Sequence, residues 1–238
     1  MSSTLTNLTH KQLFLTDCNI KGTEILITNP DLLSQVRKVL RLQKGDTIYV
    51  QNAWTRYEIE IKDWDDKTLT GVIKKSTTNQ ANALKKWMII GMPNKREKVE
   101  LIVQKLTEIW LDEIIFWPSE RSVIKTWNEN KSERLQKIAR EAVEQSWGRV
   151  MPKIEFATDI SKILKDKNVL VFDKNDNENP MKNMTEFHYG IVGPEWWLTE
   201  RDYDILKWVN FEVRELGNTM MRTETAAIVG GWIVKNEK

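Results

Sequence analysis

The chain has 238 residues, of which 40% are hydrophobic and 29% charged, and its formal net charge is +2. This composition is typical of a globular protein with one or two domains and a buried core. The longest apolar run, residues 226–234, is about half of a membrane span, and the N-terminus lacks a signal-peptide pattern. With one cysteine, Cys18, and two histidines, we expect a cytoplasmic protein with neither an internal disulfide nor a metal site.

Charge is distributed unevenly along the chain. Lys and Arg outnumber Asp and Glu by six over residues 1–153, whereas the acids outnumber the bases by four over residues 154–238. A polyanionic partner at one end would fit this asymmetry, and so would an ordinary solvated surface.

The N-terminal part predicts strands and turns. Period-two alternation and turn residues predict strands at 24–28, 44–50, 56–62 and 68–73, with one helix over 31–42. Closely spaced short strands favour a small β-barrel, which we assign to residues 1–75. Residues 76–84, rich in Ser, Thr and Asn, are the expected linker.

Residues 85–238 instead predict alternating strands and helices. The expected strands are 87–91, 113–117, 169–172, 189–193 and 210–214. Asn94, Ser132 and Thr199 are the expected starts of three helices, and 223–234 is the last helix. This alternation predicts an α/β domain with a mainly parallel sheet and helices on both faces.

Three loops follow predicted strands at the end where open α/β sheets bind ligands. They begin at Trp117, Val192 and Glu215. Gly193-Pro194 indicates a fixed turn, and Leu216-Gly217 allows the backbone to approach a flat ligand. The alternative is three ordinary connections. The sequence has no Gly-x-Gly-x-x-Gly motif, no Walker loop and no evident Cys-His or Ser-His-Asp system.

These loops resemble those of the bacterial 16S rRNA (uracil-N3)-methyltransferases of the SPOUT superfamily. Ile191-Val-Gly-Pro-Glu and Leu216-Gly, followed by Arg222-Thr-Glu-Thr-Ala, are similar to that family's two AdoMet-binding loops. Residues 39–46, 95–109, 119–122 and 140–146 are similar to further family motifs, so the resemblance covers nearly the whole chain.

The resemblance implies a PUA-like RNA-binding barrel followed by an α/β domain with a trefoil knot. It implies a homodimer that transfers a methyl group from AdoMet (S-adenosyl-L-methionine) to N3 of one uridine in 16S rRNA of the small ribosomal subunit. The cofactor-binding residues that it implies are Phe172, Val192, Gly193, Pro194, Glu195, Leu216, Gly217, Met221, Arg222 and Thr225.

Methylation at N3 of uracil requires loss of the N3 proton and stabilisation of negative charge on the ring oxygens. A guanidinium suits this role, so Arg222 is the catalytic candidate; a phosphate contact or a pair with Glu224 is the alternative. Candidates for holding RNA phosphate are Lys11, Arg41, Lys95 and Arg121, each of which could instead be a solvated surface charge. An unstacked base is the expected target.

Tryptophan stands where the family pattern or the local turn calls for glycine. The family's Gly-Pro-Glu-Gly-Gly is here Gly193-Pro-Glu-Trp196-Trp197, and its Glu-Leu-Gly is Glu108-Ile-Trp110; Trp54 and Trp147 are similar cases. The chain has only 10 Gly but 11 Trp. Our hypothesis is that the source organism reads UGA as glycine and that these tryptophans are glycine in the native protein.

Two alternatives remain open for the chain as printed. A divergent family member could have rebuilt these loops and kept its activity. An RNA-binding protein without cofactor binding would result if Trp196 and Trp197 fill the adenosyl pocket.

Overall fold

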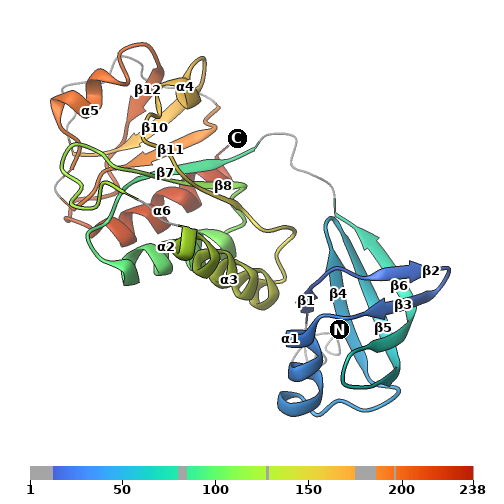
Figure 1. Cartoon of the computed structure of the whole chain (residues 1–238). Coiled ribbons are helices and arrows are strands. Elements are labelled where there is room, and N and C mark those ends of the chain that lie inside the picture. Colours follow the sequence, from blue (N-terminus) through green and yellow to red (C-terminus); the bar gives the residue numbers. More distant parts are fainter. Residues whose placement is uncertain (1–12, 80–84, 127–128, 175–185, 196, 238) are drawn as a thin grey trace. The chain divides into compact units, whose positions relative to one another are not determined.

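The structure is a computed structural model that describes residues 13–79, 85–126, 129–174, 186–195 and 197–237 (Figure 1). The chain divides into two compact units. The first is Met1–Ala81 with Glu144–Arg149, and the second is Asn82–Val143 with Val150–Lys238.

The first unit is built on a mixed six-stranded sheet. Its strands are β1 (Leu13–Leu15), β2 (Asn19–Lys21), β3 (Glu24–Ile27), β4 (Thr47–Asn52), β5 (Thr55–Trp64) and β6 (Leu69–Thr78). Their order is β1-β4-β5-β6-β3-β2, with β1 parallel to β4 and the other pairs antiparallel. Because β1 and β2 lie at opposite edges of this order, the described residues form no closed barrel, which corrects the sequence prediction. Strand β6 also continues to Thr78, into the expected linker.

One short helical segment covers this sheet. Asn29 caps α1 (Pro30–Ser34) by accepting the backbone N–H groups of Asp31 and Leu32. The chain then continues as a π-helix, η1 (Gln35–Val39), and Arg41 follows with φ of 53°. The predicted helix over 31–42 is therefore shorter, because the left-handed Arg41 cannot continue it. Leu32, Leu33 and Val36 are buried in the core of this unit.

The second unit contains the predicted parallel sheet. Its strands are β7 (Trp87–Gly91), β8 (Glu113–Trp117), β9 (Lys153–Phe156), β10 (Asn168–Phe172), β11 (Tyr189–Val192) and β12 (Asn210–Val213). All adjacent pairs are parallel, in the order β12-β10-β11-β7-β8-β9. Strand β9, at the sheet edge, was not predicted.

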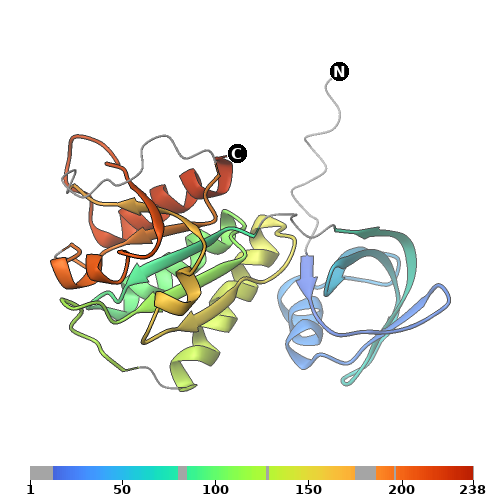
Figure 2. The ribbon, with the colours of Figure 1, turned by 90° about the horizontal axis from the view of Figure 1, so that it is seen from above.

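Helices cover both faces of this sheet (Figures 1 and 2). One face packs against α2 (Arg96–Glu108), α3 (Glu129–Ser146) and α6 (Thr223–Asn236), and the other against α4 (Ser161–Leu164) and α5 (Glu200–Asp204). In β10, Leu170 and Phe172 belong to the first core, whereas Val169 and Val171 belong to the second. This alternation follows from the two-residue period of a strand.

The helix starts were predicted with mixed success. Thr199 and Asp202 form the predicted capping box of α5. However, Lys95 rather than Asn94 precedes α2, and α3 begins at Glu129, three residues before Ser132. Across the described residues, no helix is long and apolar enough to span a membrane.

Three of the five tryptophans in question have a left-handed backbone. The φ angles of Trp110, Trp147 and Trp197 are 65°, 56° and 66°. After α2, the Trp110 N–H donates to the Thr107 carbonyl (2.9 Å) and the Leu111 N–H to the Leu106 carbonyl (3.2 Å). These two bonds define a Schellman motif, whose left-handed position is usually glycine.

The backbone of Trp54 and Trp196 gives no such support to the glycine hypothesis. In the turn between β4 and β5, the positive φ (48°) belongs to Ala53 rather than Trp54. Trp196 lies outside the described residues.

Candidate functional site

A pocket of about 560 Å³ lies beyond the carboxyl ends of β10 and β11. Parallel sheets commonly bind ligands at this edge. The residues that line it are Phe172, Asp173, Lys174, Val192, Gly193, Pro194, Glu195, Trp197, Leu216, Gly217, Thr219, Met220, Met221, Thr223 and Ala226.

The structure brings together eight of the ten residues expected to bind the cofactor. Phe172 comes from β10, Val192 to Glu195 from the end of β11, and Leu216, Gly217 and Met221 from the segment before α6. The other two, Arg222 and Thr225, are exposed and do not line the pocket, although Arg222 lies between the lining residues Met221 and Thr223. That these residues bind a cofactor stays a prediction.

Several lining residues were not predicted from the sequence, among them Asp173, Thr219 and Thr223. Asp173 directly follows a predicted strand, which is a signal that could have identified it. Thr223 lies within the Arg-Thr-Glu-Thr-Ala motif, but no pattern indicated that its side chain faces inward.

Two glycines shape the pocket walls through their backbone. A Cβ atom on Gly91, at the end of β7, would lie 2.4 Å from the backbone nitrogen of Pro194. Only glycine therefore allows the loop after β11 to cross β7 this closely. Gly217 has φ of 131°, in the region that favours glycine, so the chain turns here without strain before α6.

Trp197 is part of the pocket wall. Its backbone N–H donates to the carbonyl oxygen of Pro194 (3.2 Å), and 46% of the residue's surface is exposed. The pocket remains open beside this indole.

A lysine connects the two loops of the pocket. Lys98 Nζ lies 2.9 Å from Glu195 Oε1 and 3.4 Å from Glu224 Oε2, and the N–H of Asn94 also donates to Glu195 (3.1 Å). Burial alone would raise the pKa of Glu195, but the bonds from Lys98 and Asn94 outweigh it, so that pKa is lowered. Burial would likewise lower the pKa of Lys98, whereas the two carboxylates raise it above its ordinary value. Glu195 and Lys98 are therefore both charged at neutral pH.

Asp173 places a second carboxyl group in the pocket wall. Its Oδ2 accepts the hydroxyl of Tyr203 (3.0 Å), and its Oδ1 accepts the N–H of Lys174 (2.7 Å). Burial raises the pKa of Asp173, and these bonds offset only part of that effect. Thr223 also lines the pocket, and its buried Oγ1 atom has no hydrogen-bond partner among the described residues. A buried, unpaired hydroxyl that lines a pocket is available to a ligand.

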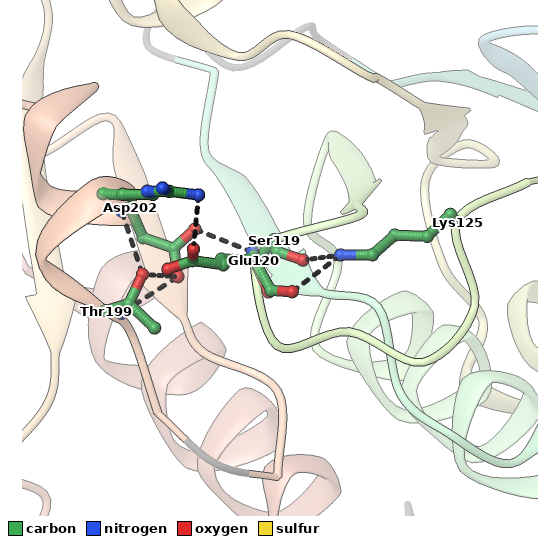
Figure 3. A network of polar contacts seen from close by, with 6 residues as sticks. Ser119, Glu120, Lys125, Thr199 and Asp202 are labelled. Atoms are coloured by element: carbon green, nitrogen blue, oxygen red, sulfur yellow. Dashed lines mark hydrogen bonds and ion pairs between the residues drawn. The ribbon is translucent and has the colours of Figure 1, made fainter.

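The third predicted loop, after β8, is fixed to the start of α5 (Figure 3). Asp202, only 3% exposed, accepts the N–H of Glu120 on Oδ1 (3.0 Å) and the N–H of Thr199 on Oδ2 (3.0 Å). Lys125 Nζ donates to the carbonyl oxygens of Ser119 and Glu120. This loop therefore has a defined conformation, although it does not line the pocket.

The residues expected to hold RNA lie on separate elements. Lys95 precedes α2, and Arg121 belongs to the loop after β8; both are exposed. Arg41 is exposed in the first unit, and Lys11 lies outside the described residues. Their role stays a prediction. No group of three or more His, Cys, Asp or Glu side chains in the described part of the chain could hold a metal ion.

The pocket has the chemistry to hold a nucleoside that carries a positive charge. Phe172, Val192 and Leu216 provide apolar contacts for a base, and Thr223 provides a free hydroxyl. Glu195 and Asp173 are carboxyl groups in the pocket wall. An adenosyl sulfonium such as AdoMet has these features, so the residues present fit it.

The sequence is similar to those of known RNA methyltransferases. Residues 80–234 match the family model of an RNA methyltransferase domain. The chain is similar to ribosomal RNA small subunit methyltransferase E of Bacillus subtilis, with 28% identity over 80% of this chain and 81% of that protein. It is also similar to ribosomal RNA small subunit methyltransferase E 2 of Borreliella burgdorferi, with 24% identity over 92% of this chain and 93% of that protein.

A solved structure shows the same fold. The crystal structure of a ribosomal RNA small subunit methyltransferase E from Neisseria gonorrhoeae, bound to S-adenosyl methionine, matches with a TM-score of 0.79 and 20% identity. The match covers 95% of this chain and 97% of the other. Since the family model covers well over half of the sequence, the chain belongs to the family of proteins with an RNA methyltransferase domain.

Proposed function

We propose that this protein methylates N3 of a uridine in 16S rRNA with AdoMet as methyl donor. The observation that carries the proposal is the pocket formed by the loops after β10 and β11 and before α6, in a chain with an RNA methyltransferase domain. Relatives named ribosomal RNA small subunit methyltransferase E, one of them solved with S-adenosyl methionine, support the substrate and the cofactor.

AdoMet would supply the methyl group from its positively charged sulfonium. The rest of the cofactor would leave as a neutral thioether. The backbone and apolar side chains of Val192 to Pro194 and Leu216 would hold the adenosyl group, with Thr223 as a hydrogen-bond donor or acceptor. When the N3–methyl bond forms and the sulfur–methyl bond breaks, the N3 proton leaves to solvent or to a base. Arg222 would stabilise the negative charge on the uracil oxygens as N3 loses its proton.

The RNA would be held by residues from both units. Lys95 and Arg121 of the second unit and Lys11 and Arg41 of the first would each contact RNA phosphate. We assign residues 1–75 to a PUA-like RNA-binding domain, 76–84 to a linker, and 85–238 to a knotted SPOUT domain. We also propose a homodimer, and an rRNA substrate places the protein in the cytoplasm.

The first experiment is a calorimetric titration of AdoMet into the chain as printed, followed by methylation of small ribosomal subunits with radiolabelled AdoMet. We expect micromolar binding and incorporation of label at a uridine. Primer extension would locate it, because a methyl group at N3 blocks Watson–Crick pairing. Binding without transfer to RNA would contradict the proposed substrate.

A competing function has one specific observation in its favour. Trp197 forms part of the pocket wall in a left-handed conformation, where an indole is unfavourable. If the printed chain binds RNA but not AdoMet, while Trp197→Gly restores AdoMet binding, the printed chain is an RNA-binding protein without cofactor.

The role of Arg222 gives a separate prediction. We expect Arg222→Ala to lower kcat about 100-fold, because one charge-stabilising donor is typically worth this much. Since Arg222 does not line the pocket, the AdoMet dissociation constant should change less than about threefold. A loss of AdoMet binding equal to the loss of activity would instead assign Arg222 to cofactor binding.

A further inference from the structure

Lys98 joins three segments of the second unit that are far apart in sequence. It belongs to α2, and its ammonium group lies between Glu195, in the loop after β11, and Glu224, in the first turn of α6. Exposure of the three side chains is only 19%, 18% and 13%. Such low exposure makes this contact stronger than an ordinary surface ion pair.

The two carboxylates depend on this lysine unequally. Glu195 also accepts the backbone N–H of Asn94. The Oε2 atom of Glu224 is buried and accepts no hydrogen bond from the described residues. It contacts Lys98 Nζ at 3.4 Å as an ion pair. Without Lys98, two partly buried negative charges would face each other with little compensation, and they would repel.

Both carboxylates are attached to the wall of the pocket. Glu195 itself lines it, and Glu224 directly follows the lining residue Thr223. Separation of the two acidic groups would therefore move the loop after β11 away from the start of α6. One part of the wall therefore comes from the loop after β11, and another from the start of α6.

We propose that Lys98 is a positioning residue that holds these two loops at the separation required for AdoMet binding. The proposal rests on the proposed function for the identity of the ligand. It assigns Lys98 no contact with the cofactor, since Lys98 does not line the pocket.

The direct test compares Lys98→Met, Lys98→Arg and a control in the same helix. Lys105→Met is a matched control because Lys105 also forms an ion pair, with Glu108 (2.9 Å), that does not involve the pocket. We expect Lys98→Met to weaken AdoMet binding about tenfold by calorimetry, and Lys98→Arg and Lys105→Met to change it less than about threefold.

A pH series separates positioning from a general loss of structure. In Lys98→Met the bond that lowers the pKa of Glu195 is lost while burial still raises that pKa, and protonation of Glu195 would remove its repulsion from Glu224. Binding of AdoMet to this variant should therefore improve as pH falls from 8 to 6, whereas the Lys105→Met variant should follow the wild type. Equal affinity of Lys98→Met and wild type at every pH would overturn the proposal.

Hydrogen exchange tests the positioning role independently of AdoMet. In Lys98→Met, amides of the loop after β11 and of the first turn of α6 should exchange faster, and those elsewhere in the sheet should not. If the wild type binds no AdoMet, the proposed cofactor function fails, and the exchange data still decide whether Lys98 orders these loops. Unchanged exchange in both segments would show that it does not.

Discussion

At the scale of single residues, three tryptophans occupy backbone conformations that favour glycine. Trp110 lies at the left-handed position of a Schellman motif, and Trp197 lies in the pocket loop. A residue with a Cβ atom in this conformation costs about 1–2 kcal/mol, which glycine avoids. Positions 110 and 197, which the family resemblance marks as glycine, are therefore strained positions in the fold.

Substitution of these residues should stabilise the protein. We expect Trp110→Gly and Trp197→Gly each to raise the free energy of unfolding by about 0.5–1 kcal/mol, because relief of strain exceeds the entropy cost of glycine. These residues are 38% and 46% exposed, so less packing is lost with either indole than with that of a fully buried tryptophan. Urea unfolding measures the change.

Two other tryptophans serve as controls for this experiment. Trp208 is 91% exposed and not left-handed, so Trp208→Gly should give no gain in stability. Trp147 packs edge-on against Tyr49 and lies under the guanidinium of Arg56. Trp147→Gly loses these contacts, so it should raise the free energy of unfolding less than Trp110→Gly does. Destabilisation by both Trp110→Gly and Trp197→Gly would contradict the glycine interpretation.

The origin of these tryptophans can be tested directly. If the source organism reads UGA as glycine, peptide mass spectrometry of the native protein will show glycine at positions 110, 196 and 197. Tryptophan at these positions in the native protein would disprove this reading and leave a divergent family member.

At the scale of secondary-structure elements, the loop after β8 depends on a residue of α5. Asp202 accepts N–H groups from Glu120 and Thr199 on separate oxygens. Asp202→Asn offers only one oxygen, so one of these donors loses its partner, at a cost of about 1–3 kcal/mol. We expect faster hydrogen exchange at the Glu120 amide, and weaker RNA methylation if Arg121 in this loop binds phosphate.

Thr199→Ala is the matched control for this prediction. It removes a capping hydroxyl of α5, which costs about 1 kcal/mol, but leaves the bond from Glu120 to Asp202. Faster exchange at Glu120 in Thr199→Ala, to the same extent as in Asp202→Asn, would show that helix stability rather than this bond controls the loop.

The elements of the second unit were predictable because their patterns are strong. Strands such as Val169 to Phe172 are continuous apolar runs, and α2 repeats apolar residues at helical spacing. Strand β9 was missed because it is a short edge strand without buried residues, and no simple periodicity signals the π-helix after α1.

The candidate site was predictable in part for a different reason. Its loops follow strands whose carboxyl ends meet at one edge, so loop position indicated the segments that begin at Val192 and Glu215. The individual cofactor-binding residues came from the family resemblance. The role of Lys98 could not be predicted, since it depends on how α2 packs beside loops about 100 residues later in the chain.

At the scale of the whole molecule, the last helix supports a prediction about assembly. Trp232 is 60% exposed on α6, the helix whose other face is buried against the sheet. Exposed aromatic residues are enriched in interfaces, so we expect Trp232→Glu to shift a homodimer toward monomer. Sedimentation velocity would measure the monomer and dimer fractions. If Trp232→Glu remains as dimeric as the wild type, the interface lies elsewhere.

The composition of the first unit has a consequence for the order of folding during synthesis. Glu144–Arg149 belongs to this unit, where Arg56 donates to the carbonyl oxygens of Trp147 (3.1 Å) and Gly148 (3.0 Å), and Gln51 donates to that of Arg149. The ribosome produces this segment more than 60 residues after Ala81. The N-terminal sheet therefore leaves the exit tunnel before its last segment exists. It remains incomplete until about two fifths of the second unit has been translated.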